Sequence, residues 1–513
     1  MLYVTLQGYD LRYDLEHLLN TFYKREDLVF ISENENEEIE IKEEKIDVLS
    51  VTSQLHGDTV VYMVGAAFDA DPSEEMPWET KSGEILVGSD EHEAFRKLKQ
   101  EIKRTVYDYV SSKVKSTSPW GILVGMRPVK LVHEMLDTGM TPEVVGLKLR
   151  DDYRVSNEKI ELALQIADVE RPYPESASTD PISLYICIPF CPTRCLYCSF
   201  PSNAMGQKGK LMDPYLDALI KEIKEVSEMI DKSLQRVDCI YIGGGTPTSL
   251  SESQLERLLH EIETQVGTDK LVEYTVEAGR PDSITEDKLK IMKKYGVDRI
   301  CINPQTMNDD TLTIIGREHN KEDVRSVYEM AKNIGFKSIN MDLIIGLPGE
   351  TARSVEETMA HVGAMRPENV TLHTLAIKRS SRLNQTLQQK SGSEYELSSA
   401  GDAEKMMEIA MASLYGMEMH PYYMYRQKKI LANLENVGFC KEGHESVYNI
   451  RIMEERHQIV ALGAGAASKM VYLNENRFER VANTKGVEDY IERVDEMIEK
   501  KRPYLLGEKS TKA

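Results

Sequence analysis

The sequence predicts an α/β protein built around a partial (β/α)6 barrel of the TIM type, and three observations support this fold class. Apolar runs of strand length alternate with amphipathic helical stretches across residues 182–380. A linker rich in proline, residues 171–181, separates this part from an N-terminal region that covers residues 1–170. The alternation then ends, and residues 381–513 follow a mostly helical pattern. Because strands that alternate with helices form right-handed βαβ units, the central sheet should be parallel.

Composition and charge exclude several classes of protein. The chain has 513 residues, of which 41% are hydrophobic and 29% charged, as in ordinary globular proteins. Its 85 acidic and 63 basic residues give a formal net charge of −22, which disfavours broad contact with nucleic acid or anionic lipid. No run of about 18 apolar residues is present, so we expect no membrane span. The start of the chain lacks a secretory pattern, and we therefore expect a cytoplasmic protein.

The N-terminal region is expected to be an accessory α+β region. An acidic segment at residues 33–47 fits a solvated loop or hairpin edge. Residues 119–128 are rich in glycine and proline, and we interpret them as a connector with a buried Trp120, with a docking loop as the alternative. The predicted elements are strands at residues 2–6 and 60–65 and helices at residues 11–23, 91–114 and 128–166.

The barrel should place its active site at the carboxyl ends of its strands. After the barrel we expect a helix at residues 395–417, then a tyrosine-rich stretch at residues 422–425 and a glycine-rich stretch at residues 461–468. The predicted barrel strands cover residues 184–190, 237–242, 272–278, 299–303, 338–345 and 370–376. The helices between them cover residues 214–230, 253–266, 285–295, 323–334 and 355–365.

The central motif of the sequence is Cys191-Pro-Thr-Arg-Cys195-Leu-Tyr-Cys198, directly after the first barrel strand. Three thiolates at this spacing can hold one small iron–sulfur cluster, and a structural zinc site is the alternative. We favour a [4Fe–4S] cluster because zinc needs four ligands, usually in two separated pairs. Three cysteines would leave one iron open to a substrate or cofactor. A fourth nearby cysteine, Cys187, lies on the predicted strand and is interpreted as core or barrel lining.

Glycines and polar residues follow the later strands, where a ligand at the barrel mouth would lie. The segment Tyr241-Ile-Gly-Gly-Gly-Thr-Pro-Thr248 lets backbone amides approach a ligand closely, or simply forms a tight turn. Glu277, Gln305 and Asp342 lie on or after strands three, four and five. Each could be a structural hydrogen-bonding group, but together they indicate a ring of ligand-binding groups. Arg317 could meet a carboxylate or stack on an adenine.

The cysteine motif, with the aromatic Tyr197 before its last cysteine, resembles the signature of the radical S-adenosylmethionine (SAM) superfamily. The resemblance implies a [4Fe–4S] cluster with three cysteine ligands, whose open iron binds SAM. It also implies that an electron from the cluster cleaves SAM, and that the resulting 5′-deoxyadenosyl radical abstracts hydrogen from a substrate. The protein would then supply placement and exclusion of water.

Four segments narrow the resemblance: residues 184–191, 243–248, 341–348 and 463–468. Together they resemble the oxygen-independent coproporphyrinogen III oxidase (coproporphyrinogen dehydrogenase) family over about residues 183–470. The long N-terminal region resembles the HemZ-type branch of that family. The implied reaction is the oxidative decarboxylation of two propionates of coproporphyrinogen III to vinyl groups, which gives protoporphyrinogen IX in haem synthesis.

The same resemblance implies roles for individual residues. The cluster would be held by Cys191, Cys195 and Cys198. The SAM on the cluster would contact Tyr185, Gly244 and Glu277. A second SAM, which better-known members of the family bind, would contact Tyr197, Gly245, Thr246, Gln305, Arg317 and Asp342.

Two departures from the family pattern keep other functions open. The established dehydrogenases have histidine where this chain has Cys187, and a fourth cysteine where it has Phe200. Phenylalanine at the second place is shared with the haem-chaperone branch, so a protein that binds and delivers haem is one alternative. Its candidate axial ligands are His444 and His457, although we favour the interpretation of both as surface histidines. A radical SAM methyltransferase is another alternative.

The implied partners are a porphyrinogen or haem-type tetrapyrrole and a low-potential electron donor such as flavodoxin or ferredoxin. The tyrosines at residues 422–425 could pack on a tetrapyrrole or belong to the core. A substrate with four carboxylates needs local positive charge, which charge-assisted hydrogen bonds would use. The candidate basic residues are Lys378, Arg379, Arg382, Lys390, Arg426, Lys428 and Lys429.

Overall fold

The computed structural model describes most of the chain as two compact units. Residues 1–164 with 432–434 form the first unit, and residues 165–431 with 435–513 form the second. The described residues are 1–32, 45–72, 74–88, 90–124, 127–173, 181–200, 203–389, 397–427, 430–472, 475 and 477–507. Several sequence-based expectations fall outside them: most of the acidic segment (33–44), most of the linker (174–180), and Lys390, Lys428 and Lys429.

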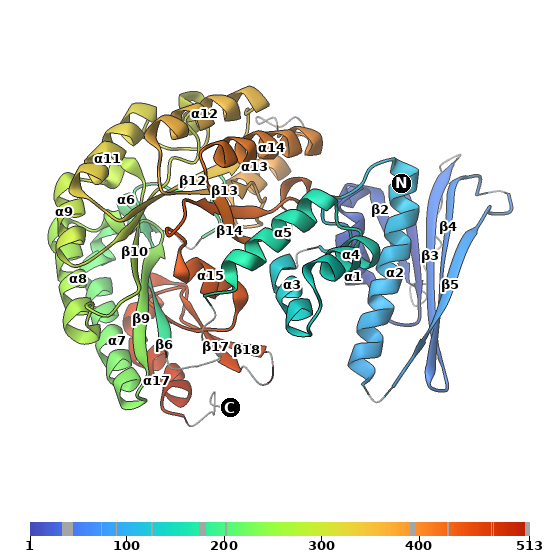
Figure 1. The fold of residues 1–513 in the computed structure, drawn as a ribbon, viewed down its shortest axis with the longest axis horizontal. Helices are drawn as coiled ribbons and strands as arrows, with labels where there is room; N and C mark the ends of the chain where they lie inside the picture. Colours follow the sequence, from blue (N-terminus) through green and yellow to red (C-terminus); the bar gives the residue numbers. More distant parts are fainter. Residues whose placement is uncertain are drawn as a thin grey trace. The chain divides into compact units, whose positions relative to one another are not determined.

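The first unit packs helix α2 on a five-stranded sheet with the strand order β2-β1-β3-β4-β5 (Figure 1). Leu98, Ile102 and Val106 of α2 lie in its apolar core. Trp120 is 0% exposed, which confirms that the tryptophan of the loop at residues 119–128 is buried. The strands are β1 (Leu2–Gln7), β2 (Leu28–Ser32), β3 (Ile46–His56), β4 (Thr59–Ala70) and β5 (Glu79–Leu86). The helices are α1 (Arg12–Leu19), α2 (Glu91–Val114), α3 (Pro128–Asp137), α4 (Pro142–Tyr153) and α5 (Asn157–Glu170), the last of which ends in the second unit.

The second unit confirms the predicted α/β barrel. Six strands pair in parallel in the order β13-β12-β11-β10-β9-β6, and helices α7, α8, α9, α11 and α12 line the outer side of this curved sheet (Figure 1). The strands are β6 (Pro181–Ile188), β9 (Arg236–Gly244), β10 (Glu273–Gly279), β11 (Arg299–Ile302), β12 (Ser338–Ile345) and β13 (Asn369–Thr374). The helices are α6 (Met205–Lys208), α7 (Met212–Lys232), α8 (Glu252–Val266), α9 (Glu286–Lys294), α10 (Asp309–Ile314), α11 (Lys321–Ile334) and α12 (Ala352–Met365).

Side-chain caps fix where several barrel helices begin. Ser251 precedes α8 and accepts a hydrogen bond from the backbone N–H of Gln254, whose side chain bonds back to Ser251. Asn320 and Thr351 form the same reciprocal arrangement at the starts of α11 and α12. Such caps satisfy backbone donors that a helix start leaves unpaired. They therefore hold the loops that lead from the strand ends into the helices.

The C-terminal region extends the barrel sheet at both edges, which the sequence analysis did not predict. Strand β16 (Gln458–Leu462) pairs in parallel with β6, and β15 (Asn436–Cys440) pairs antiparallel with β13. The tyrosine-rich stretch is β14 (His420–Tyr425), and the burial of Tyr422 and Tyr423 confirms the core interpretation for these two. The remaining elements are α13 (Arg382–Gln389), α14 (Ala400–Gly416), α15 (Val447–Glu454), β17 (Ala467–Tyr472), β18 (Arg477–Ala482), α16 (Val487–Glu492) and α17 (Val494–Leu505). Among the described residues, no helix is long and apolar enough to cross a bilayer.

A buried polar network attaches the C-terminal helices to the barrel. Glu222 on α7 and Lys501 on α17 are both 0% exposed, and Lys501 Nζ lies 2.8 Å from Glu222 Oε1. Glu222 also accepts hydrogen bonds from the Tyr490 hydroxyl at 2.6 Å and from the backbone N–H of Gly463 at 2.8 Å. Lys501 donates a further bond to Asn483. Each buried charge therefore has several partners, which is the condition under which burial of charge is tolerated.

Replacing Lys501 by methionine should destabilise the second unit, because it leaves the Glu222 carboxylate buried without its counter-ion. Removal of one partner of a buried ion pair typically costs about 3–5 kcal/mol. We therefore expect the midpoint of thermal unfolding to fall by several degrees in Lys501→Met. The matched control is Lys500→Met on the exposed side of the same helix, which should unfold like the wild type. Equal unfolding temperatures for the two variants would contradict the role of the network.

Candidate functional site

The cysteine loop follows β6 at the carboxyl end of the barrel strands and is fastened on two sides. The backbone N–H of Leu196 donates to the carbonyl of Ile315 at 3.0 Å, and the N–H of Leu383 donates to the carbonyl of Leu196 at 2.9 Å. Arg194 donates to the carbonyl of Ser380 at 2.6 Å. Two other segments of the second unit, around Ile315 and around Ser380 and Leu383, therefore hold the cysteine loop in one conformation.

The three cysteines of this loop are largely withdrawn from solvent, with Cys191 and Cys195 buried and Cys198 half-buried. Burial, together with the neighbouring Cys198 and Cys195, raises the pKa of Cys191 to about 11 despite the hydrogen bond from Thr246. Burial likewise raises the pKa of Cys198, while Arg194 and Arg317 lower it. Buried thiols of this kind ionise only when a strong positive charge such as iron compensates them.

The donor set fits a cluster better than a single metal ion. Two groups of His, Cys, Asp or Glu in the described part of the chain bring three ligand atoms within 4.8 Å of one another, and neither contains Cys191, Cys195 or Cys198. The ligand atoms around a single zinc ion lie closer together than 4.8 Å, and the sulfur atoms of Cys191, Cys195 and Cys198 do not all meet this limit. Three sulfur donors at a wider spacing fit an iron–sulfur cluster, as the sequence analysis predicted.

The glycine segment after β9 lies directly against the cysteine loop. The N–H of Gly245 donates to Ile188 at 2.8 Å, and the Thr246 hydroxyl donates to the sulfur of Cys191 at 3.5 Å. A Cβ atom at Gly245 would lie 2.5 Å from the carbonyl oxygen of Phe190 and 2.9 Å from the Cys191 sulfur. Gly244 has a φ of 108°, a conformation that side chains disfavour. Only glycine therefore fits at these two positions.

Two carboxyl groups of the predicted site, Glu277 on β10 and Asp342 on β12, have different proton affinities. Burial raises the pKa of Glu277 to about 7, and the negative charge of Asp342 adds to this effect. The Tyr241 hydroxyl donates to Glu277 at 2.5 Å. Burial acts on Asp342 as well, but His373 and Asn340 more than offset it, so its pKa is lowered. Glu277 can therefore exchange a proton near neutral pH while Asp342 stays ionised.

Aromatic rings surround these carboxyl groups. Tyr241 stacks on Tyr448 with a centroid distance of 4.5 Å, and Tyr185 stacks on Tyr241 at 6.2 Å. The Tyr425 hydroxyl lies 3.2 Å from Nδ1 of His373, whose Nε2 lies 3.6 Å from Asp342. Tyr241 and Tyr448 are buried, whereas the side chains of Asp342 and His373 are 19% and 26% exposed.

Of the remaining predicted residues, Arg317 and Tyr197 contact one another at the cysteine loop, and Gln305 lies beside Asp342. Arg317 donates to the Tyr197 hydroxyl at 3.1 Å and to the carbonyl of Asn303 at 3.2 Å, while its buried Nε has no partner within the described residues. Gln305 has a φ of 72°, and its N–H donates to the carbonyl of Asp342 at 2.9 Å. An unusual backbone conformation of this kind in a non-glycine residue is common at ligand-binding sites.

The structure thus places the predicted residues in two connected groups, one in the barrel interior and one at the cysteine loop. Sequence reasoning missed four residues that complete these groups. Tyr241, His373 and Tyr448 contact the interior carboxyl groups or their neighbours, and Arg280 donates to Thr193 of the cysteine loop at 2.7 Å. Alternate side chains of a β-strand point to the same face of the sheet. This rule could have identified Tyr241 and His373, because both lie on the same inward face as Glu277 and Asp342.

The basic residues and histidines considered for the substrate have mixed environments. Arg379 and Arg382 are exposed, whereas Arg426 is buried. The surface interpretation of His457 is wrong, because this side chain is 6% exposed and burial lowers its pKa to about 4. His444 is half-buried.

Comparison with known proteins gives a consistent set of relatives. A family model described as the radical SAM superfamily matches residues 185–362. The chain is 40% identical over 428 residues to the oxygen-independent coproporphyrinogen-III oxidase-like protein HemZ of Bacillus subtilis, covering 82% of this chain and 84% of that protein. It is 34% identical over 323 residues to the haem chaperone HemW of the same organism, covering 63% and 77%. The fold is similar to that of the Escherichia coli coproporphyrinogen III oxidase HemN, a radical SAM enzyme, with a TM-score of 0.51 and 23% identity over 65% of this chain and 73% of the other.

The raised pKa of Glu277 predicts a specific pH dependence of stability. The folded protein keeps a proton on Glu277 that the unfolded chain, with an ordinary value of 4.5, releases. Relative to Glu277→Gln, the wild type should therefore lose stability as the pH rises from about 4.5 to about 7. Thermal unfolding of both proteins across this range measures the difference.

The control for this measurement is Glu329→Gln, which changes an exposed glutamate on α11. Its unfolding temperature should follow that of the wild type at every pH. Parallel curves for the wild type and Glu277→Gln would show that Glu277 titrates normally and would contradict the assignment.

Proposed function

Because the chain belongs to the radical SAM superfamily and to its oxygen-independent coproporphyrinogen-III oxidase-like family, we propose that it oxidatively decarboxylates coproporphyrinogen III to protoporphyrinogen IX. The observation that carries the proposal is the 40% identity to a HemZ protein over 82% of the chain. Proteins of the superfamily use a [4Fe–4S] cluster and SAM. The proposed reaction belongs to haem synthesis in the cytoplasm.

We assign the cluster to Cys191, Cys195 and Cys198, on the basis of their shared loop and wide spacing. When bound, the cluster supplies the electron that cleaves SAM into methionine and a 5′-deoxyadenosyl radical. The proposed contacts of the SAM on the cluster are Tyr185, Gly244 and Glu277. The proposed contacts of a second SAM are Tyr197, Gly245, Thr246, Gln305, Arg317 and Asp342.

Within this proposal, Glu277 responds to the charge of SAM. The sulfonium of SAM is positive, so it favours the ionised form of a nearby carboxyl group. Glu277 is poised to lose its proton near neutral pH, and the hydrogen bond from Tyr241 holds it in one orientation. The Tyr241 ring also stacks on that of Tyr185. Binding of SAM would therefore release a proton and fix a buried ion pair.

The chemistry balances for each propionate side chain. The group –CH2–CH2–COO⁻ becomes –CH=CH2 and CO2, and it gives up one hydrogen atom and one further electron. The 5′-deoxyadenosyl radical takes the hydrogen atom, and a separate one-electron acceptor takes the electron. A low-potential donor such as flavodoxin or ferredoxin would supply the electron that cleaves SAM.

Exposed basic residues beside the cysteine loop support an anionic substrate. Arg382 donates to the carbonyl of Arg194 in this loop at 3.4 Å, and Arg379 is exposed nearby in the chain. Guanidinium groups bind carboxylates through paired hydrogen bonds. These two arginines are the described candidates for holding propionates that are not being decarboxylated.

A haem chaperone is the second candidate function, and two observations favour it. The chain is 34% identical to a HemW protein over 323 residues. Phe200 stands where the established dehydrogenases have a fourth cysteine, and its side chain is 64% exposed. An exposed phenyl ring next to the cysteine loop could contact a flat tetrapyrrole.

Alanine substitutions should separate the ligand cysteines from other cysteines. Protein purified and reconstituted without oxygen should lose most of its iron and sulfide in Cys191→Ala, Cys195→Ala and Cys198→Ala, because each removes one of three ligands. Cys187→Ala and Cys239→Ala should retain wild-type contents, since both cysteines lie on barrel strands. Loss of iron in Cys187→Ala, or retention in the other three variants, would contradict the assignment.

Anaerobic turnover distinguishes the two functions. With full cluster loading, SAM, a reductant and coproporphyrinogen III, the proposed oxidase should form vinyl products and 5′-deoxyadenosine, as measured by mass spectrometry. A chaperone should instead bind haem stably and give no vinyl product. Absence of vinyl product at full loading would contradict the proposed oxidase.

A further inference from the structure

A second group of metal-ligating side chains lies at the opposite end of the barrel from the cysteine loop. His420 at the start of β14 pairs with Cys440 at the end of β15, and Cys440 also pairs with Asn369, the first residue of β13. Glu445 follows in the loop before α15. This group therefore lies at the amino ends of the parallel strands, whereas the cysteine loop follows their carboxyl ends.

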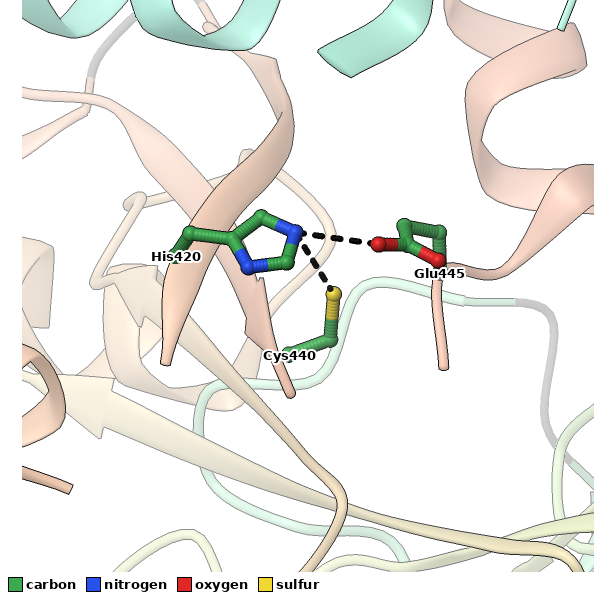
Figure 2. A group of neighbouring side chains, drawn as sticks. All are labelled: His420, Cys440 and Glu445. Carbon is green, nitrogen blue, oxygen red and sulfur yellow. Dashed lines mark hydrogen bonds and ion pairs between the residues drawn. The ribbon is translucent and has the colours of Figure 1, made fainter. Parts of the chain in front are cut away.

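Figure 2 shows the three side chains pointing toward one another. Nε2 of His420 lies 3.0 Å from Oε1 of Glu445 and 3.6 Å from Sγ of Cys440. The ligand atoms of all three residues lie within 4.8 Å of one another. The same ring nitrogen thus faces both the sulfur and the carboxylate, so the three groups converge on one point. A relay of protons would instead use the two ring nitrogens separately.

The separation of the Cys440 sulfur and the His420 nitrogen matches that around a tetrahedral zinc ion. Bonds of about 2.3 Å to sulfur and about 2.0 Å to nitrogen place these two ligand atoms about 3.5 Å apart. The corresponding distance here is 3.6 Å. Sulfur, imidazole and carboxylate donors together are typical of zinc, which accepts all three. We propose that His420, Cys440 and Glu445 bind one zinc ion and leave its fourth position to water.

The surroundings of the three residues suit a positive ion. The side chain of Glu445 is 8% exposed, and its Oε1 lies against the His420 ring. Tyr173 donates to Oε2 of Glu445 at 3.0 Å and leaves Oε1 directed at the site. Hydrogen-bonded neighbours that orient a ligand in this way are usual in metal sites.

The metal-free arrangement also explains how zinc would enter. Cys440 is buried, and without metal the His420 ring pairs with both the Cys440 sulfur and the Glu445 carboxylate. Zinc would replace the protons in these contacts, which would be released to solvent. The His420 side chain is 32% exposed, which gives the ion and its water a path from outside.

The bound ion would fix the loop before α15 to the β14–β15 hairpin. Both elements cover the amino end of the barrel sheet, and Ser446 and Val447 in the same segment bond to Glu273 on β10. The site lies at the other end of the strands from the cysteine loop, so the ion would take no part in the chemistry at that loop. The proposal is independent of the reaction proposed above.

Zinc content and zinc spectroscopy test the site. The protein should be purified anaerobically with a full cluster, so that the cysteine loop is occupied, and then incubated with zinc and passed through gel filtration. We expect about one retained zinc per chain. Zinc K-edge absorption should show a single sulfur at about 2.3 Å with nitrogen and oxygen at about 2.0 Å. No retained zinc, or zinc without a sulfur neighbour, would overturn the proposal.

Variants separate a metal site from a hydrogen-bonded group. Cys440→Ser and His420→Gln should each lose the retained zinc, and Cys239→Ser, a buried cysteine elsewhere, should keep it. Zinc should raise the unfolding temperature of the wild type by several degrees and leave that of His420→Gln unchanged. Because each protein is compared with itself with and without zinc, a lower stability of the variant does not affect this test. Equal retention of zinc, or an equal rise in unfolding temperature, in wild type and variants would contradict the site.

Discussion

The structure of the candidate site depends on the close approach of two backbone segments, the cysteine loop after β6 and the glycine segment after β9. Parallel pairing of these strands brings the Gly245 backbone within hydrogen-bond distance of Ile188. A side chain at Gly245 would collide with the Cys191 sulfur. Because Gly244 and Gly245 have no side chains, the cysteine loop with its three thiols can lie directly against the glycine segment. The other predicted site residues lie around this contact.

Inside the barrel, two carboxyl groups have different proton affinities. Desolvation acts on both Glu277 and Asp342, but only Asp342 has hydrogen bonds from His373 and Asn340 that outweigh it. A cation that binds here would meet the negative charge of Asp342 and would favour ionisation of Glu277. This arrangement suits the positively charged SAM.

The sequence allowed the six barrel strands, the cysteine loop and the glycine segment to be predicted, because long apolar runs and clustered motifs are local signals. The edge strands β15 and β16 were missed because they are short and their partners, β13 and β6, are remote in sequence. Tyr241 and His373 were missed because each is an ordinary strand residue until the neighbouring strands are placed. His420, Cys440 and Glu445 have no motif spacing, and only the antiparallel pairing of β14 and β15 brings the first two together.

The most direct test of the central claim is electron paramagnetic resonance of the reduced cluster, recorded without oxygen and with and without SAM. If Cys191, Cys195 and Cys198 hold three irons and SAM binds the fourth, the g-values of the reduced cluster should change when SAM is added. An unchanged spectrum at saturating SAM would show that no iron is open to it, and would contradict the account.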